Sequence, residues 1–262
     1  MSTPRVIVIT GASGGIGRTC AIALSHAFPS QAQPEPLVLV LSGRRKAELE
    51  ATAKECREGT TVEICVGDVS SDADVQGMFG TVKEKYGRVD LLFNNAGVDL
   101  LNSVPLEEAD MSKFRQVLEV NVMSAVLCTS EAIKIMKEQS PAGGRIVNNG
   151  SISATSPRPN SAAYTVSKHA ITGLTRSTSL DGRKYSITAT QLDIGNAQTA
   201  MGGHAAKGCR QADGSIKSEP MMDVANVGKT LVFLAGLEPA ADVLHLELLS
   251  FGTGYSPAWK AR

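Results

Sequence analysis

Short runs of β-branched and leucine residues alternate along the chain with longer stretches in which apolar side chains recur at helical spacing. The short runs predict seven strands, at 5–10, 37–41, 62–66, 89–93, 145–148, 187–192 and 244–249. The longer stretches predict helices at 15–27, 46–58, 72–86, 107–139 (two helices), 161–181 and 223–235. Regular alternation of this kind is typical of βαβ units. The pattern therefore predicts an α/β fold, a doubly wound parallel β-sheet of about seven strands with helices on both faces.

The segment 195–220 departs from this alternation, because it is rich in glycine, alanine, lysine and serine and follows neither period. A long irregular segment inside a compact α/β domain is commonly a functional loop. We therefore expect 195–220 to form a lid over a substrate site. No repeat or low-complexity tract marks a second domain, and α/β folds reach this length around one sheet. We expect residues 1–262 to form a single domain.

The loop after the first predicted strand reads T-G-A-S-G-G-I-G over residues 10–17. Gly11 can make the tight turn, Gly15 can let a pyrophosphate approach the backbone, and Gly17 can let helix and strand pack closely. The following helix would point its N-terminal amides at the phosphates. No Gly-Lys-Ser/Thr follows, so the loop is not a Walker A motif. The loop predicts a dinucleotide site.

Further motifs follow in chain order. Asp-Val at 68–69 follows the third predicted strand, N-N-A-G at 94–97 follows the fourth, and Asn121 lies in Val-Asn-Val. Ser151 follows the fifth, and Tyr164-x-x-x-Lys168 begins thirteen residues later. Together with T-G-x-x-x-G-x-G, these motifs resemble the short-chain dehydrogenase/reductase (SDR) family over essentially the whole chain. The resemblance implies a Rossmann-like fold and a single-domain enzyme.

The candidate chemistry lies on one helix face, because Tyr164 and Lys168 are four residues apart. A free phenol has a pKa near 10, and an adjacent ammonium favours the phenolate. We therefore expect the pKa of Tyr164 to move toward working pH, so that it exchanges a proton with a carbonyl or alcohol oxygen. Ser151 would hydrogen-bond the same oxygen. By the resemblance, Lys168 also holds the nicotinamide ribose, and Asn121 supports Lys168 through a water-linked proton path.

The end of the second predicted strand bears on the choice of cofactor. A carboxylate there binds the 2′-OH of NAD, whereas an arginine accepts the 2′-phosphate of NADP. The chain has three cations at 44–46 and no acidic residue before Glu48. Cations at a helix N-terminus are unfavourable without an anion, although such a run can also be a solvated helix start. We predict NADP(H) in preference to NAD(H), with Arg44 as the principal contact and Ser42 or Arg45 as a second.

The segment after the sixth predicted strand departs from the family. SDR proteins usually have Pro-Gly there, whereas this chain reads Asp193-Ile194-Gly195, without the proline that fixes φ. The resemblance implies that the Ile194 backbone and the Thr199 side chain contact the nicotinamide amide. The full set expected to bind the cofactor is Gly11, Ser13, Gly15, Ile16, Gly17, Ser42, Arg44, Arg45, Asp68, Val69, Asn95, Ala96, Gly97, Tyr164, Lys168, Ile194 and Thr199.

Other residues carry weaker expectations. Met201 and His204 in the lid are candidates for substrate contact, as is the tail with Tyr255 and Trp259. The remaining histidines are expected to be helix or strand residues without a chemical role; they are His26, His169 and His245.

Composition narrows the partners. The chain has 26 Lys+Arg and 26 Asp+Glu, so it lacks the basic excess of proteins that bind nucleic acid or anionic membranes. From its N-terminal residues and the length of its apolar runs, we expect neither a secretory leader nor a membrane span. Its five cysteines are scattered and form no C-x-x-C pair, which indicates reduced thiols rather than a metal site. We expect a cytoplasmic protein without metal and, from the resemblance, a homodimer or homotetramer.

Three functional hypotheses follow. The first is an NADPH-dependent carbonyl reductase, reversible as an alcohol dehydrogenase, acting on a small-molecule ketone or alcohol. The second is a biosynthetic reductase of an imine or an activated double bond. The third is a nucleotide-binding regulator without turnover, which the intact tyrosine disfavours.

Overall fold

The computed structural model describes residues 3–203 and 208–253. Seven parallel strands form one sheet in the order β3-β2-β1-β4-β5-β6-β9. Because the chain moves outward from β1 to β3 and then returns to pair β4 with β1, a crevice opens at the carboxyl ends of β1 and β4. The doubly wound, Rossmann-like sheet predicted from the sequence is confirmed. The strands are β1 (Arg5–Thr10), β2 (Leu37–Gly43), β3 (Thr61–Val66), β4 (Leu91–Asn94), β5 (Gly144–Asn149), β6 (Ile187–Ile194) and β9 (His245–Leu248).

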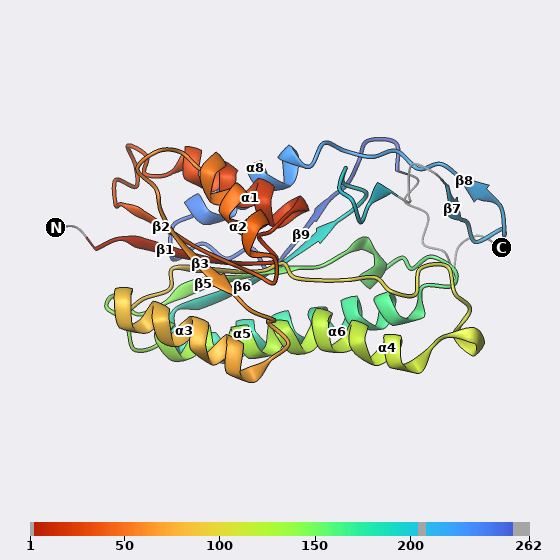
Figure 1. Ribbon diagram of the computed structural model, residues 1–262, viewed down its shortest axis with the longest axis horizontal. Coiled ribbons are helices and arrows are strands. Elements are labelled where there is room, and N and C mark those ends of the chain that lie inside the picture. Colours follow the sequence, from red (N-terminus) through yellow and green to blue (C-terminus); the bar gives the residue numbers. More distant parts are fainter. Residues whose placement is uncertain (1–2, 204–207, 254–262) are drawn as a thin grey trace.

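Helices cover both faces of the sheet (Figure 1). One face carries α1 (Gly15–Ala27), α2 (Lys46–Glu55) and α8 (Ala225–Gly236). The other carries α3 (Asp72–Tyr86), α4 (Met111–Leu118), α5 (Ser124–Met136) and α6 (Ala162–Gly182). Within the described ranges, no helix combines the length and the apolarity that a bilayer crossing requires.

Alternation within the strands divides the core into two layers. In β1, Val6 and Val8 pack with the side chains of α3 and α5, whereas Ile7 and Ile9 pack with those of α1 and α8. All four side chains are fully buried. A parallel sheet covered on both faces needs apolar residues at consecutive positions, which explains the continuous hydrophobic runs in the sequence.

Local signals explain where some elements begin and end. The predicted bounds of β1, α1 and α3 agree with the structure residue by residue. At the start of α3 the Ser71 side chain accepts a hydrogen bond from the Asp74 amide, and at its end Gly87 adopts φ 66°. A serine N-cap commonly begins a helix, and a left-handed glycine commonly ends one. Both signals can be recognised in the sequence.

Two regions show more than the sequence predicts. The stretch 107–139 does contain the two predicted helices, α4 and α5, but a π-helical segment at Glu119–Met123 joins them directly, and a 3-10 turn, Leu106–Glu108, precedes α4. Hydrophobic period does not reveal a π insertion, because it adds one residue to a turn without changing the buried face greatly. The segment 195–220 contains a small antiparallel hairpin, β7 (Cys209–Arg210) and β8 (Ile216–Lys217), that was not predicted.

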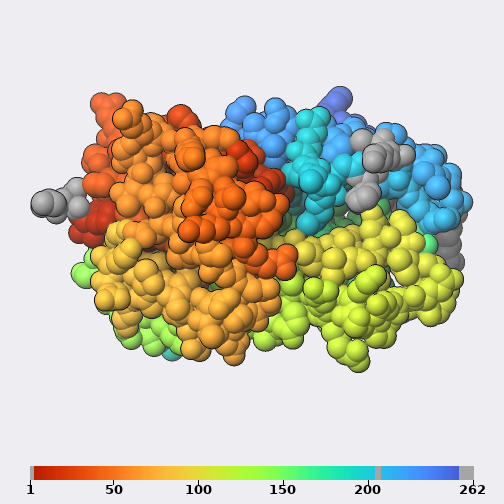
Figure 2. All heavy atoms as spheres, in the orientation of Figure 1, coloured from red at the N-terminus to blue at the C-terminus, as the bar shows by residue number. Residues whose placement is uncertain are grey.

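The segment after β6 lies over the end of the molecule to which the strands point. In Figure 1 the β7–β8 hairpin and α4 stand at this end, opposite the start of β1. In Figure 2 the cyan surface of the segment after β6 lies beside the orange surface of the N-terminal third. The two regions therefore share the crevice at the carboxyl edge of the sheet.

Candidate active site

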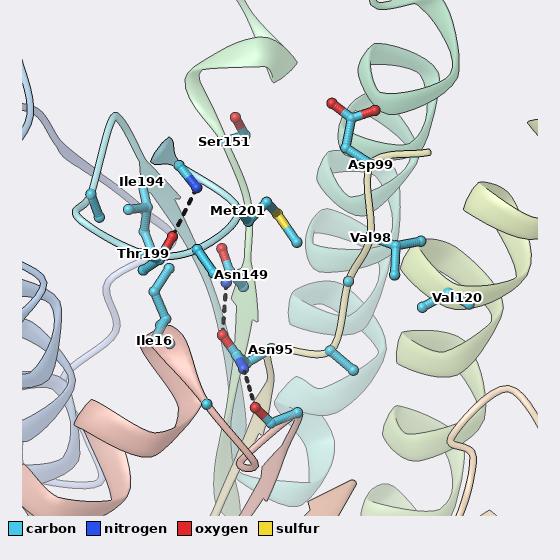
Figure 3. A pocket seen from close by; sticks show the side chains of 18 of the residues that line it. Ile16, Asn95, Val98, Asp99, Val120, Asn149, Ser151, Ile194, Thr199 and Met201 are labelled. Carbon is cyan, nitrogen blue, oxygen red and sulfur yellow. Dashed lines mark hydrogen bonds between the residues drawn. The ribbon is translucent and has the colours of Figure 1, made fainter. Parts of the chain in front are cut away.

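A cleft of about 700 Å³ lies along the carboxyl edge of the sheet. Its outer end is formed by Ser13, Arg44, Arg45 and Asp68, which follow β1, β2 and β3. Its inner end, at the loops after β5 and β6 and at α6, is formed by Ser151, Tyr164, Lys168 and Ile194. Figure 3 shows Ile194, Thr199 and Met201 on one side of the cleft and Val98, Asp99 and Val120 on the other. Candidate cofactor and candidate catalytic residues thus line one continuous space.

Glycines shape the floor between the two ends. Gly11 and Gly15 adopt φ values of 66° and 52°, which side-chain-bearing residues rarely do. A Cβ on Gly17 would lie 2.4 Å from the Gly11 carbonyl oxygen, so α1 packs against the β1 turn only because residue 17 is glycine. Gly11 thus makes the turn, and Gly17 permits the close packing, that the sequence suggests, whereas cofactor binding by the loop stays a prediction. Gly17 itself is buried behind the cleft rather than lining it.

A polar network ties the loops after β1, β4 and β5 together. The Thr10 hydroxyl accepts hydrogen bonds from the amides of Asn95 (2.9 Å) and Ala96 (3.0 Å). The Asn95 side chain donates to the Thr10 carbonyl at 2.9 Å. It also accepts from the Asn149 amide group at 2.9 Å (Figure 3). Thr10 and Asn149 were not among the expected site residues. Their role depends on strand order, which brings β1, β4 and β5 together at this edge.

The outer end of the cleft is basic and exposed. The Arg45 guanidinium donates to the Ser13 hydroxyl (3.1 Å), and Arg44 lies 3.8 Å from the Asp68 carboxylate. The Arg44 and Arg45 side chains are 63% and 59% exposed. Ser42 differs from the expectation: it is 2% exposed within β2, and its neighbour Gly43 lines the cleft instead. Alternation along a strand turns residue 42 away from the cleft, because successive side chains point to opposite faces.

These residues fit a dinucleotide. No side chain caps the N-terminus of α1, and its first turn carries no acidic residue, so its leading amides and the positive end of its dipole suit a pyrophosphate. A Cβ built on Gly15 would have the Thr199 side chain as its nearest neighbour, at 3.7 Å. The outer end supplies two guanidinium groups for a further phosphate. The predicted NADP(H) would extend from Arg44 and Arg45 across Gly15 toward Tyr164.

The inner end holds the candidate catalytic groups. Ser151 precedes the 3-10 turn Ile152–Ala154 and is 6% exposed. Lys168 is equally buried, and its ammonium donates to the Asn149 carbonyl at 2.8 Å and lies 5.4 Å from the centre of the Tyr164 ring. Ser151 lies close enough to Tyr164 to lower the pKa of its hydroxyl. The structure therefore brings Ser151, Tyr164 and Lys168 together, as their sequence spacing suggested.

The pKa of Tyr164 moves in the direction opposite to the one expected. Burial raises it to about 12, and the hydrogen bond with Ser151 opposes the rise. The expectation was wrong because it considered the neighbouring ammonium and neglected desolvation, which here is the larger effect. Burial also lowers the pKa of Lys168 to about 8, against the negative charge of Asp193, which raises it. Tyr164 is therefore a neutral phenol at pH 7.

Asn121 lies beside this group but does not line the cleft. It belongs to the π-helical segment Glu119–Met123. Its side chain accepts from the Val98 amide (2.7 Å) and donates to the Val98 carbonyl (2.9 Å) and to the Ser167 hydroxyl (3.1 Å). Asn121 thus fastens the loop after β4 to α6, next to Lys168. Its water-linked path to Lys168 stays a prediction.

Asp193 forms a network that sequence reasoning missed. It lies one residue before the end of β6 and is fully buried. Its carboxylate accepts hydrogen bonds from the Ser151 amide (2.7 Å) and the Gln191 side chain (2.8 Å). The His245 imidazole on β9 lies 2.7 Å from its second oxygen. His245 is a strand residue as expected, but it contacts a group of the active site. Asp193 lies on β6 and His245 on β9, so their contact can be recognised only once these two strands are known to pair.

The substrate side of the cleft combines apolar and polar walls. Val98, Asp99 and Met201 line it, together with Arg158, whose guanidinium pairs with Glu219 and donates to Asn196 (2.9 Å). His204, Tyr255 and Trp259 lie outside the described residues. His26 and His169 lie on α1 and α6, as expected.

Most of the expected cofactor residues line the cleft; only Gly17 and Ser42 do not. Those that line it are Gly11, Ser13, Gly15, Ile16, Arg44, Arg45, Asp68, Val69, Asn95, Ala96, Gly97, Tyr164, Lys168, Ile194 and Thr199. Among residues 3–203 and 208–253, one group has the composition of a metal site: Asp193, His245 and Glu247, whose potential ligand atoms lie within 4.8 Å of one another.

Comparisons with solved structures agree with this fold. A variant of actinorhodin polyketide ketoreductase, crystallised with NADPH, has a TM-score of 0.81 and 25% identity, covering 95% of this chain and 98% of its own. An alcohol dehydrogenase from Thermococcus sibiricus, complexed with 5-hydroxy-NADP, has a TM-score of 0.77 and 25% identity, covering 94% and 97%.

Sequence relatives extend the likeness. A 3beta-hydroxysteroid dehydrogenase from Mediterraneibacter gnavus is 31% identical over 86% of this chain and 75% of its own length. A sepiapterin reductase from Chlorobaculum tepidum is 33% identical over 76% and 80%. The family model described as short chain dehydrogenase matches residues 5–209, from β1 through the glycine loop and α6 to the start of the hairpin. With its motifs in register over that span, the chain belongs to the short-chain dehydrogenase/reductase family of oxidoreductases.

Proposed function

We propose that the protein is an NADP(H)-dependent carbonyl reductase, reversible as an alcohol dehydrogenase, that transfers a hydride between NADP(H) and a small-molecule ketone or alcohol. One observation carries the proposal: Ser151, Tyr164 and Lys168 line the same cleft as the glycine loop and Arg44. A dinucleotide bound along this cleft with its phosphates at the loop would bring its nicotinamide end to the Tyr164 hydroxyl.

The residues at the inner end account for the proton in this reaction. The cofactor, when bound, supplies or accepts the hydride. Tyr164 is a neutral phenol at pH 7, because burial raises its pKa to about 12, so it holds a proton that it can donate to a carbonyl oxygen during reduction. Ser151 lies close enough to the phenol to lower its pKa, and it would hydrogen-bond the same substrate oxygen. The buried Lys168 ammonium beside the ring stabilises the phenolate left behind.

The preference for NADP(H) rests on the outer end. Arg44 and Arg45 present guanidinium groups where a 2′-phosphate would lie. Arg44 forms an ion pair with Asp68, at 3.8 Å. Guanidinium binds phosphate through two parallel hydrogen bonds. The NADPH and 5-hydroxy-NADP found with two related structures add support.

A neutral substrate of modest size suits the substrate side. Val98, Val120 and Met201 give apolar contact area, and the charge of Arg158 is already paired with Glu219. The dehydrogenases and reductases among the relatives favour a ketone or alcohol over an imine.

The wider organisation is part of the same proposal. We place the whole chain in a single domain, with 195–220 as the lid; Thr199, Met201 and Cys209 of that segment line the cleft. Exposed apolar side chains at the outer helices support a homodimer or homotetramer; they are Met111, Met123 and Val166. All five cysteines are free thiols, as a reducing cytoplasm would keep them.

The test is the Tyr164→Phe variant. With NADPH and a panel of ketones and aldehydes, the variant should reduce carbonyls about two to four orders of magnitude more slowly than the wild type, because it lacks the general acid. Its NADPH affinity should stay within a few-fold. Tyr185→Phe, whose ring lies near Lys184 and away from the cleft, is the matched control and should keep full activity. An unchanged rate in Tyr164→Phe would mean that the proton comes from elsewhere, as in the reduction of an activated double bond.

A further inference from the structure

Asp193 occupies a position that connects the active site with the far edge of the sheet. Its carboxylate is fully buried at the end of β6, between the loop that carries Ser151 and the edge strand β9. One oxygen accepts from the Ser151 amide at 2.7 Å, and the other lies 2.7 Å from Nε2 of His245. Gln191 donates to both oxygens, at 2.8 and 3.0 Å. The carboxylate therefore has partners on both sides.

The loop after β5 is built around this carboxylate. A Cβ on Gly150 would lie 1.9 Å from Oδ1 of Asp193 and 2.9 Å from the Gln191 side chain, so only glycine leaves room for the carboxylate. The residues on either side of Gly150 contact the candidate catalytic groups: the Asn149 carbonyl accepts from the Lys168 ammonium at 2.8 Å, and Ser151 lies close enough to Tyr164 to lower its pKa. The position of Asp193 thus sets the backbone that carries both contacts.

The second partner of the carboxylate is an imidazole that reaches solvent. The His245 side chain is 47% exposed, whereas that of Asp193 is 0% exposed. A carboxylate is an acceptor only, so the hydrogen bond requires His245 to carry its proton on Nε2. A buried charge needs such partners, because removing it from water is costly. His245 is therefore the donor that orients the Asp193 carboxylate on the side away from catalysis.

The charge of Asp193 acts on both titratable catalytic groups. It raises the pKa of Lys168 and of Tyr164. Other charged groups face them as well: Asp99 raises the pKa of Tyr164 and Arg158 lowers it. On β9, His245 and Glu247 lie beside Asp193. Among these groups, Asp193 is the one that also accepts a hydrogen bond from the Ser151 backbone amide.

We propose that the buried Asp193 carboxylate and the half-exposed His245 imidazole form a hydrogen-bonded pair that positions Ser151 and supplies a fixed negative charge behind Tyr164 and Lys168. Both are positioning residues, since neither lines the cleft. The inference rests on the proposed carbonyl reduction for its kinetic test. The position of the Asp193 carboxylate also accounts for glycine at position 150.

The first test compares Asp193→Asn with Glu247→Gln. Asparagine keeps the volume and an acceptor for the Ser151 amide but removes the charge. Because the charge raises the pKa of Tyr164 and Lys168, its removal should shift the alkaline decline of ketone reduction to lower pH by about one unit. It should also lower kcat by about tenfold or more, with the NADPH affinity kept within a few-fold. Glu247→Gln removes the charge of a neighbouring residue on the edge strand β9, and should leave the pH profile in place.

The second test separates the pair from mere packing. His245→Phe removes the donor to Asp193 and should lower kcat, whereas His245→Gln offers an amide donor and should restore most of it. Independently of activity, ¹⁵N NMR of His245 in the wild-type protein should show the Nε2-protonated tautomer, and this preference should be lost in Asp193→Asn.

Three outcomes would overturn the proposal. An active wild type with identical pH profiles for Asp193→Asn and Glu247→Gln would show that the charge of Asp193 has no kinetic role. Equal losses of kcat in His245→Phe and His245→Gln, together with an Nδ1-protonated tautomer in the wild type, would show that His245 does not donate a hydrogen bond to Asp193. Loss of activity on chelation with EDTA, together with equal damage in Asp193→Asn and Glu247→Gln, would assign the three side chains to a metal instead. A wild type that turns over no carbonyl contradicts the proposed function, and the NMR result would then decide on the pair alone.

Discussion

The two ends of the cleft differ in how far their charged side chains are removed from water. At the inner end Lys168 is 6% exposed and Asp193 is fully buried. At the outer end the side chains of Arg44 and Arg45 are 63% and 59% exposed. Coulomb interactions are several-fold stronger in a buried site than in water, and exposed charges are screened by salt. The inner end can therefore shift pKa values and do chemistry, whereas the outer end can recognise a ligand that is already charged.

The largest expected effect that sharpens this comparison is the pH dependence of the inner end. Burial lowers the pKa of Lys168 to about 8, so its ammonium is present below that pH and is lost above it. We expect kcat/KM for NADPH, which reports groups of the free enzyme, to fall about tenfold per pH unit above pH 8, or about a hundredfold by pH 10. Tyr164, with a pKa raised to about 12, stays protonated over this range.

Lys168→Arg provides the control for this pH profile. Arginine stays charged at every accessible pH, so the remaining activity of the variant should lack the decline near pH 8. A wild-type profile that stays flat to pH 10 would mean that Lys168 keeps its proton and that the inner end is not the dry environment described here.

A substitution at Gly17 tests the floor that joins the two ends. In Gly17→Ala the new Cβ would meet the Gly11 carbonyl oxygen at 2.4 Å, and because both are backbone or near-backbone atoms, α1 must move. Overpacking of this kind costs about 1–3 kcal/mol of unfolding free energy. Cofactor affinity should fall with it, by about ten- to a hundredfold in a fluorescence titration. Gly80→Ala is the control, because a Cβ there meets nothing within 4 Å and alanine favours the helix α3. Equal stability of the two variants would contradict the packing argument.

The outer end should respond with a smaller and salt-dependent effect. Arg44→Asp removes a guanidinium and places a carboxylate where a 2′-phosphate would bind, so KM for NADPH should rise about tenfold or more while KM for NADH changes little. Raising the ionic strength should reduce the difference, since the site is exposed. Lys46→Asp is the control, because Lys46 pairs with Glu50 and does not line the cleft. Equal changes for both cofactors would sink the assignment of Arg44 to the 2′-phosphate.

The smallest expected effect concerns Ser42. Because Ser42 is 2% exposed and turned away from the cleft, Ser42→Ala should leave KM for NADPH within about twofold, less than a single lost hydrogen bond would cause. A selective rise in KM for NADPH would restore Ser42 as the second contact and show that the strand end moves on cofactor binding.

The glycine loop that forms the floor of the cleft could be predicted from the sequence, because local backbone requirements fix the residue types there. A left-handed turn and a close helix–strand approach require glycine, so the structural roles of Gly11 and Gly17 can be predicted without knowledge of the fold. The strands were equally readable, since a parallel sheet covered on both faces needs long apolar runs. Tyr164, Lys168 and Ser151 were identified by a spacing that resembles a known family.

The parts that escaped prediction depend on neighbours far apart in the sequence. Asp193 was noticed only as an unusual residue, because its partners Ser151 and His245 lie 42 and 52 positions away. The rise in the pKa of Tyr164 escaped for the same reason, since burial is a property of the assembled site. The Thr10–Asn95–Asn149 network likewise exists only after β1, β4 and β5 are placed side by side.

The most direct test of the central claim is to follow both ends of the cleft in one experiment. NADPH and NADH are titrated into the protein by fluorescence, and the preferred cofactor, deuterated at the nicotinamide C4 position, is then incubated with a panel of ketones and aldehydes. The account predicts tighter binding of NADPH than of NADH and transfer of deuterium to the carbonyl carbon of a product alcohol. Binding of neither cofactor would contradict the dinucleotide site, and binding of NADPH without transfer to any carbonyl would contradict the assignment of Tyr164, Ser151 and Lys168 to carbonyl reduction.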